Sequence, residues 1–218
     1  MTNIYNLLSD DLTRGFNWRL REIHQLRTAI SDVADLDKGS VARASFVLLY
    51  AHWEGFIKRS TELFFNYIIR LNKPVHELHV GAKVVCLRRE IVHALTYGNK
   101  TNKQIVALLQ IVAESGNKKL TKRHAAHMVQ SANMTFSEFA DTCILFGIES
   151  SEFDEYQDLI DKILVHKRHQ IAHGAYLHVG SEDFVSTSDD VIAVMRRFRN
   201  QIENVFLERV GFPGANAV

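Results

Sequence analysis

The residues with the clearest capacity for chemistry lie in a basic run that spells RHQIAHG over positions 168–174. The guanidinium of Arg168 is planar and always charged, so it suits a phosphate or a developing phosphorane. The imidazole of His173 can move protons near neutral pH. Together they are the smallest set that could cleave RNA without a metal, with His173 serving the 2′-oxygen or the leaving 5′-oxygen and Arg168 stabilising charge. The same spacing also occurs at helix ends that carry favourable cations.

This pair can act together only if the end of its helix is distorted. Two side chains five positions apart on a regular α-helix point about 140° away from one another. Gly174 follows directly and suits a left-handed C-cap, which would let His173 turn away from the regular helix. We therefore expect a helix over 152–173 that ends at this glycine. Its buried face is expected to consist of Tyr156, Leu159, Ile160, Ile163, Leu164 and Ile171.

Several other helices are needed to position this one. Helical periodicity predicts helices over about 10–33, 80–97 and 102–113. After a break at 37–40 (Asp-Lys-Gly-Ser), a broad apolar stripe predicts a helix of roughly 30 residues that lasts to about Leu71. A second helix in antiparallel contact would be needed to cover that stripe. The chain has only two prolines, which permits helices of this length.

The segment before the motif helix is less regular. Residues 117–134 are polar and basic, and they are predicted to be mostly loop. Thr135 is a candidate N-cap for a short helix, because Glu138 stands at the reciprocal position of a capping box. We expect this short helix to end at Gly147.

The C-terminal part contains one further long helix. Residues 176–187 alternate weakly and are expected to form a loop or a short hairpin. The Ser-Asp-Asp sequence at 188–190 is predicted to cap a final helix, whose inward residues would be Val191, Met195, Phe198, Ile202, Val205 and Phe206. The fold class we predict is an all-α helical bundle with long antiparallel helices. It would form a single domain over 1–212, with a frayed tail over 213–218.

The formal net charge of +1 excludes a strong positive field over the whole protein. Any contact with RNA must therefore come from a local basic patch. Lys118, Lys119, Lys122 and Arg123 form one candidate patch that could grip phosphates. The alternative, a basic loop that is only solvated, is at least as good an interpretation.

Two cysteines and the absence of export signals bear on the compartment. Cys86 and Cys143 are each flanked by apolar residues, which favours buried thiols in a reducing compartment over a disulfide. The N-terminus lacks the basic and then apolar segments of a signal peptide. No apolar run approaches the roughly 20 residues that a membrane span needs. We therefore expect a soluble, cytoplasmic protein without a membrane partner.

Three segments resemble one known superfamily. The string LIDKILVHKRHQIAHG (159–174) resembles the Rx4–6H motif of the HEPN superfamily, in which a polar residue directly follows the arginine, as His169 does here. The string LLYAHWEGFIKRSTELFFNYI (48–68) is similar to the long second helix of the RiboL-PSP-HEPN and MAE-type groups. The string SANMTFSEFADTCILFGI (131–148) is similar to the short helix that precedes their motif helix.

This resemblance implies a helical protein that dimerises and joins two motifs in one composite cleft. It implies a metal-independent endoribonuclease without a cofactor, which leaves a 2′,3′-cyclic phosphate and serves as a toxin or in defence against phage. Arg168 and His173 would be catalytic, and His169 would orient them or contact RNA. Apart from the resemblance, Tyr176 is a further candidate to support the site or contact RNA. An antitoxin or another companion protein could restrain the enzyme. Toxins silenced by a nucleotidyltransferase carry tyrosine two residues after the motif histidine, where this chain has Ala175, and this argues against such modification.

Further polar residues leave alternatives open. Glu54 lies inside the apolar stripe of the long helix. It would either serve the site, by orienting Arg168 or lying in the catalytic cleft, or occupy a partly exposed edge position paired with Lys58 one turn away. His52 is more consistent with a structural polar group than with a catalyst. His76 and His79, like the pair at 124 and 127, have metal-ligand spacing but no companion ligands, so no metal site is predicted.

Two alternatives to the nuclease remain. One is a non-catalytic HEPN module that binds a nucleotide, RNA or a partner protein. The other is a metal-dependent hydrolase that uses the histidine pairs, and it would lose its activity in the presence of a chelator.

Overall fold

A computed structural model describes residues 2–96, 101–125, 128 and 133–211. All regular elements in these ranges are helices, which confirms the predicted all-α fold class. The α-helices are α1 (Thr2–Asp32), α2 (Asp35–Leu71), α3 (Val80–Thr96), α4 (Asn102–Glu114), α5 (Lys122–Ala125), α6 (Phe136–Phe146), α7 (His166–Ala172) and α8 (Ser181–Val205). Two 3-10 helices (Val75–Glu77, Ser150–Tyr156) and two π-helices (Leu159–Val165, Phe206–Gly211) complete the set.

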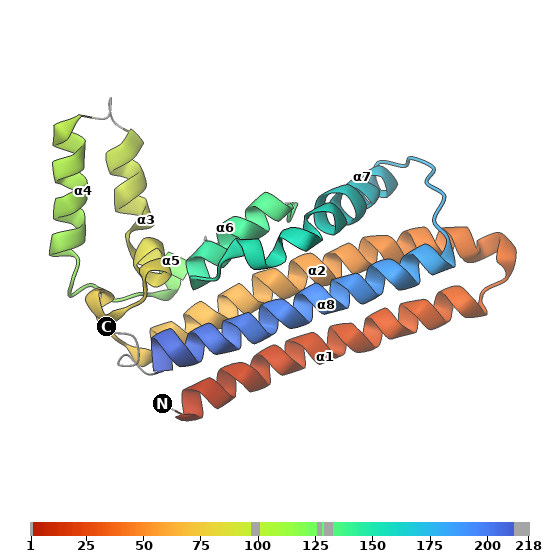
Figure 1. The fold of residues 1–218 in the computed structure, drawn as a ribbon, viewed down its shortest axis with the longest axis horizontal. Coiled ribbons are helices and arrows are strands. Elements are labelled where there is room, and N and C mark those ends of the chain that lie inside the picture. The colour runs from red at the N-terminus through yellow and green to blue at the C-terminus, as the bar shows by residue number, and fades with distance from the viewer. Residues whose placement is uncertain (1, 97–100, 126–127, 129–132, 212–218) are drawn as a thin grey trace.

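Three long helices lie side by side as one layer of the fold (Figure 1). Helix α1 runs antiparallel to α2 and α8, which share one direction. Each helix buries an apolar stripe at helical spacing, because burial of such a stripe is what stabilises a long helix in water. Large aromatic residues fill the space between them, including Phe16 of α1, Trp53 and Phe56 of α2 and Phe198 of α8, all at most 3% exposed. The inward residues predicted for the last helix are all buried.

The predicted break at 37–40 is wrong. The chain turns earlier, at Val33 and Ala34, and the amides of Asp37 and Lys38 both donate to the carbonyl of Ala34. Helix α2 therefore already contains Gly39, and an interior glycine weakens a helix without ending it. Its long apolar face against α1 and α8 outweighs that cost.

The predicted start of the last helix is wrong as well. Helix α8 begins at Ser181, so much of the expected loop or hairpin over 176–187 is helical and residues 188–190 lie inside the helix. The reason is tertiary packing: Phe184 is fully buried against Phe46, with ring centroids 5.5 Å apart. Ser188 is fully buried and accepts a hydrogen bond of 2.8 Å from Nε of Arg27, on α1.

Helices α6 and α7, with the π-helix between them, form a second layer over α2 and α8 (Figure 1). The predicted capping box is present: Thr135 Oγ1 accepts from the Glu138 amide at 3.3 Å, and the Thr135 amide donates to Glu138 at 3.0 Å. Helix α6 ends at Gly147, with a φ of 77°. The segment 117–134, predicted to be mostly loop, contains the short helix α5.

The prediction of one continuous α-helix over 152–173 is wrong, because the segment consists of three helices of different types. The chain there forms a 3-10 helix, a π-helix and then α7. Leu159, Ile160 and Leu164 are buried as expected, whereas the other three predicted residues (Tyr156, Ile163 and Ile171) are only half-buried against the core. Asp161 accepts the Phe136 amide at 2.8 Å. This bond ties the wide turn to the start of α6. Because a π-turn holds more residues than an α-turn, it changes the direction in which the residues of α7 point.

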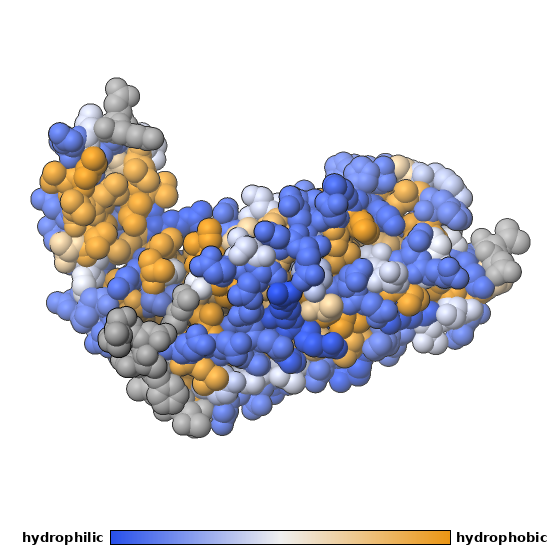
Figure 2. Space-filling view, viewed as in Figure 1, coloured by the Kyte–Doolittle hydropathy of each residue, from blue (hydrophilic) through white to orange (hydrophobic). Residues whose placement is uncertain are grey.

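Helices α3 and α4 form a hairpin that extends from the rest of the fold (Figure 1). No residue of α4 is buried. Exposed apolar side chains gather on this hairpin (Figure 2), namely Val84, Val92, Leu95, Ile105, Val106, Leu109 and Val112. A surface on which several exposed apolar side chains gather is typical of a contact with another molecule.

The cysteines are buried and unpaired, as predicted. Burial raises the pKa of Cys143 to about 12, so this thiol is unreactive in the folded protein. Within the described ranges, no helix combines the length and apolarity needed to cross a membrane. The tail predicted to be frayed, 213–218, lies outside the described residues.

Gly81 tests the contact between α3 and α6. A Cβ at this position would lie well inside contact distance of the Leu145 carbonyl oxygen. We expect Gly81→Ala to lower the free energy of unfolding by about 1–3 kcal/mol, as overpacking does. Gly39→Ala is the matched control, because its Cβ would meet only the flexible Arg43 side chain at 3.5 Å. It should be neutral or stabilising by up to about 1 kcal/mol. Urea denaturation measures both, and equal effects would contradict the packing described.

Candidate active site

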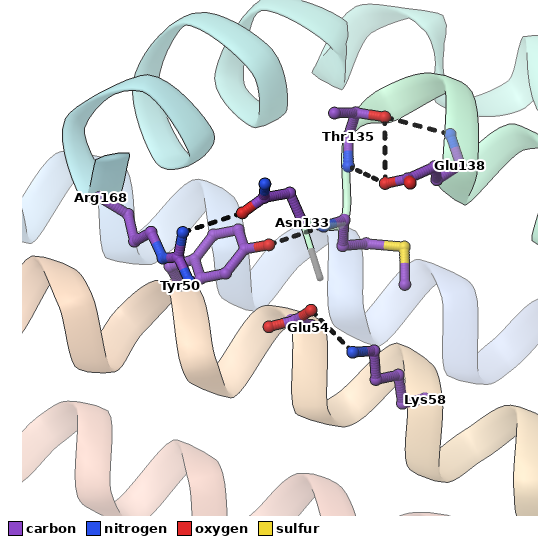
Figure 3. Close-up of polar contacts among 8 residues, drawn as sticks. Tyr50, Glu54, Lys58, Asn133, Thr135, Glu138 and Arg168 are labelled. Atoms are coloured by element: carbon purple, nitrogen blue, oxygen red, sulfur yellow. Dashed lines mark hydrogen bonds and ion pairs between the residues drawn. The ribbon is translucent and has the colours of Figure 1, made fainter. Parts of the chain in front are cut away.

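Arg168 is held by two residues from distant parts of the chain (Figure 3). Its Nη1 donates a hydrogen bond of 2.8 Å to Oδ1 of Asn133, just before α6. Its Cζ lies 5.2 Å from the ring centroid of Tyr50, on α2. Both contacts restrict the guanidinium, and only one of its five N–H donors is used by Asn133. Arg168 is half-buried, so the remaining donors can meet a ligand from the solvent side.

Tyr50 is itself fixed in place. Its side chain is 2% exposed, and its hydroxyl accepts the backbone N–H of Met134 at 2.6 Å. Burial raises the pKa of this hydroxyl, with a further contribution from the Glu54 carboxylate, so the group stays neutral. Three consecutive residues thus organise the site: Asn133 binds Arg168, Met134 binds Tyr50, and Thr135 caps α6. Of these three, Met134 makes the bond between the two layers.

The two motif histidines lie one helical turn apart at the end of α7. The ring centroids of His169 and His173 are 4.3 Å apart, and both side chains are exposed. Gly174 has a φ of 78°. Its amide donates to Ile171 at 3.1 Å, and the next amide, of Ala175, donates to Gln170 at 3.0 Å. This is the Schellman pattern, so the predicted glycine cap is present.

The helix end does not turn His173 toward Arg168. His173 is the C-cap residue, with φ −92° and ψ 12°, and its ring stays beside His169. In the described part of the chain, Arg168 contacts Asn133 and Tyr50, and no hydrogen bond joins it to His173. Within one copy of the chain, the two principal residues therefore face different neighbours.

Glu54 takes the local pairing, which was one of its two predicted roles. Its Oε1 lies 2.8 Å from Nζ of Lys58, and its side chain is 17% exposed. Figure 3 shows this pair on α2, beneath Tyr50 and Asn133. Glu54 thus lies beside the site and acts on Tyr50 through its charge, without binding Arg168.

Tyr176 lies in the segment after the motif and is 83% exposed. Its ring lies 5.1 Å from the guanidinium carbon of Arg43, whose Nη1 also donates to the Leu177 carbonyl at 3.4 Å. Lys167 lies with Nζ 4.7 Å from the Phe46 ring. Arg43 and Lys167 therefore add positive charge on the side of α2 that faces the motif, which favours a polyanion.

The predicted basic patch lies elsewhere. Lys118, Lys119, Lys122 and Arg123 are exposed near α3 and α5, at the other end of the molecule from α7 (Figure 1). Lys118 is paired with Glu90 at 3.1 Å. A cavity of about 720 Å³ lies beside Arg123, lined also by Arg88, Arg89 and His93. The structure does not bring this patch to Arg168.

The histidine pairs do not form a metal centre in the described ranges, which contain no group of three or more candidate ligands. His76 is hydrogen bonded through Nδ1 to the Gly116 carbonyl at 2.8 Å. His124 contacts Thr121 and, at 3.8 Å, the Cys86 sulfur. The second member of that pair, at position 127, lies outside the described residues.

Sequence reasoning missed Tyr50, Asn133, Arg43 and Lys167. Tyr50 and Asn133 lie in two of the strings that carry the family resemblance, but neither stands in a pattern that signals chemistry. Asn133 is 35 positions from Arg168, and their contact depends on how the segment before α6 is placed against α7. No local spacing could have revealed it.

Tyr50→Phe tests whether the hydroxyl joins the two layers. The buried amide of Met134 would lose its acceptor while the ring beneath Arg168 stays, so we expect unfolding free energy to fall by about 1–3 kcal/mol. Tyr176→Phe makes the same chemical change on an exposed ring and should stay within about 0.5 kcal/mol of wild type. Chemical denaturation compares them. A neutral Tyr50→Phe would contradict this role.

The sequence model of the RiboL-PSP-HEPN family matches residues 14–204. Searches of curated proteins and of solved structures gave no significant match. The matched range holds α2, α6 and α7, together with Tyr50 and Asn133, the two residues described above as contacts of Arg168. It covers far more than half of the 218 residues. The chain therefore belongs to the RiboL-PSP-HEPN family.

Proposed function

We propose that the protein is a metal-independent endoribonuclease that cleaves RNA by transesterification through the 2′-hydroxyl. One observation carries this proposal: Arg168 is held by Asn133 and Tyr50 with donors to spare, on the same short helix as two exposed histidines. A fixed guanidinium can bind a phosphodiester and stabilise the added charge of a phosphorane. Membership of a HEPN family supports the same activity.

The proposed reaction balances without a metal or a cofactor. His173 accepts the proton of the 2′-hydroxyl, and the 2′-oxygen forms a bond to phosphorus. The bond between phosphorus and the 5′-oxygen breaks, and this oxygen receives a proton from a protonated histidine. Arg168 stabilises the added negative charge of the phosphorane through which the reaction passes. The products are a 2′,3′-cyclic phosphate and a 5′-hydroxyl. His169, with its ring 4.3 Å from His173, would orient that ring or contact RNA, and Tyr176 would contact RNA.

We also propose that two copies share the site. Within one chain Arg168 and His173 have different neighbours, and His173 and Tyr176 are open to solvent. Catalysis by fixed charges is most effective where water is excluded. A second copy placed over the end of α7 would cover the site and could bring its own histidine to Arg168. Most oligomers of this kind have twofold symmetry, which would produce two such sites.

The biological role we propose is that of a toxin or a phage-defence effector, with RNA as substrate. An antitoxin or another companion protein would restrain it, and the exposed apolar side chains of α3 and α4 are one surface for such a contact. The alternative function is a non-catalytic module that binds RNA or a nucleotide. The lack of a direct contact between Arg168 and His173 in one chain favours that alternative if the protein is a monomer.

The nuclease proposal is tested by incubating RNA with purified protein in excess EDTA. Wild type should cleave, while Arg168→Ala and His173→Ala should each lower the rate by at least about 100-fold, the usual scale for an acid–base or charge-stabilising group. Arg88→Ala and His178→Ala remove exposed residues of the same types and should keep the wild-type rate. Cleavage that survives both motif substitutions would exclude this site. No cleavage of any RNA by the wild type would favour the binding module.

The shared site is tested by mixing the two inactive variants. If Arg168 of one copy works with His173 of the other, a mixed dimer has one intact pair. Half of randomly reassorted dimers are mixed, so activity should return to about a quarter of wild type. Each variant alone at the same total concentration is the control. A mixture as inactive as its components would show that both residues must come from one chain.

A further inference from the structure

A second arginine site lies on α1, away from the residues discussed so far. Arg19 is only 7% exposed. Its Nη1 donates to the Gly15 carbonyl at 2.7 Å, but its buried Nε has no hydrogen-bond partner. Within the described ranges, no carboxylate forms an ion pair with it. A buried charge normally has a partner of opposite sign, because desolvation is costly without one.

The surroundings of Arg19 are strongly positive. A cavity of about 530 Å³ is lined by Arg14, Arg19, Arg21 and Arg59, together with a single acidic side chain, Asp11. Asp11 forms an ion pair with Arg14. Among the described residues, Arg59 is the other lining arginine with a carboxylate partner. That partner is the exposed Glu62. Within the described ranges, the other two guanidinium groups on the cavity wall, those of Arg19 and Arg21, have no carboxylate in an ion pair.

Glu22 acts on Arg19 through its negative charge but forms no ion pair with it within the described ranges. Glu22 lies with Oε2 3.2 Å from Nε2 of His52. Burial and the positive charge of Arg59 lower the pKa of Arg19 to about 10, although the negative charge of Glu22 acts in the opposite direction. The guanidinium therefore stays charged at neutral pH, and no carboxylate of the described residues is bonded to it. Burial also lowers the pKa of His52, which adds no positive charge of its own near pH 7.

The sequence leaves room for this guanidinium and places an aromatic ring beside it. Gly55 of α2 faces Arg19, and a Cβ there would lie 3.2 Å from Nη2. The Cζ of Arg19 lies 4.4 Å from the ring centroid of Trp18. Trp18 also lines the cavity and is 43% exposed, so its indole is accessible to a ligand. The cavity thus offers free cationic donors and an exposed aromatic ring together.

We propose that this cavity binds the terminal phosphate of a nucleoside 5′-monophosphate group, with the base against Trp18. Such a phosphate carries a charge of about −2 near pH 7, which matches the two guanidinium groups without an anion. Arginine binds phosphate through paired, charge-assisted hydrogen bonds, and a base stacks on an indole. The group has two sources, a free nucleotide and the 5′-phosphorylated end of an RNA strand.

This site is separate from the candidate active site. Arg19 faces α2 at Gly55, whereas Arg168 faces it at Tyr50, five positions earlier. Five positions on a helix correspond to a rotation of about 140°. The two sites therefore lie on different sides of α2, and the proposal does not depend on the nuclease activity.

Trp18 provides the readout for the test. The chain has two tryptophans, and the other one, Trp53, is fully buried. Acrylamide, a neutral quencher, therefore reports mainly on Trp18. The full-length protein in EDTA is titrated with AMP, with adenosine, and with a short 2′-O-methyl RNA carrying either a 5′-phosphate or a 5′-hydroxyl. The 2′-O-methyl groups prevent cleavage through the 2′-oxygen.

AMP or the 5′-phosphorylated RNA should protect Trp18 from acrylamide, while adenosine and the 5′-hydroxyl RNA should not at the same concentrations. Protection by AMP alone identifies a free nucleotide as the source, and protection by the RNA alone identifies a strand end. No protection by either ligand at millimolar concentration would overturn the proposal. So would equal protection by the ligands with and without the phosphate.

Two variants link the binding to Arg19. Arg19→Gln removes the charge, and Gly55→Ala places a methyl group against Nη2 while favouring the helix. Each should weaken binding by about tenfold or more, the scale of one charge-assisted hydrogen bond. Arg88→Gln removes an exposed arginine of α3 and should bind as wild type does. Circular dichroism establishes folding, and Gly55→Ala decides the test if Arg19→Gln fails to fold. Wild-type affinity in the folded variants would overturn the proposal.

Discussion

The hydrogen bond from the Met134 amide to the Tyr50 hydroxyl joins the two layers of the protein at the place where the candidate site forms. Tyr50 lies on the central helix α2, and Met134 lies at the start of the layer that holds α6, the π-helix and α7. With this bond in place, the neighbouring Asn133 reaches Arg168, and the ring of Tyr50 supports the guanidinium. The position of Arg168 is therefore a consequence of layer packing rather than of the motif helix alone.

Helix α2 organises both sides of the molecule. On one side it supports Arg168 through Tyr50, and on another it makes room for Arg19 at Gly55. Both guanidinium groups are partly or fully withdrawn from water, and both retain donors that no carboxylate occupies. Arginine that is fixed and lacks a counter-ion is well suited to phosphate. Two such guanidinium groups, one from α1 and one from α7, pack against the same helix α2, which favours a protein that handles phosphate groups at more than one place.

Some features could be predicted from the sequence because they depend on local rules. The apolar stripes of α1, α2 and α8 are long enough that periodicity alone predicts them. The caps at Thr135 and Gly174 follow from the backbone geometry that only certain residues favour. These predictions succeeded because no tertiary contact opposes them.

Other features could not be predicted, because they depend on contacts between distant segments. The start of α8 is set by the burial of Phe184 and by the bond from Arg27 to Ser188, a pair 161 positions apart. The π-helix is tied to α6 by Asp161. Arg19 stands in an ordinary amphipathic pattern on α1, and only the packing of α1 on α2 makes it a buried charge.

The central claim, cleavage through the 2′-hydroxyl without a metal, is tested most directly by a matched pair of RNA substrates in EDTA. One is unmodified, and the other lacks the 2′-hydroxyl only at the mapped cleavage position. Our account predicts cleavage of the first, to a 2′,3′-cyclic phosphate and a 5′-hydroxyl, and no cleavage of the second at that position. Cleavage of the deoxy-substituted RNA there, or products with a 3′-hydroxyl and a 5′-phosphate, would contradict it.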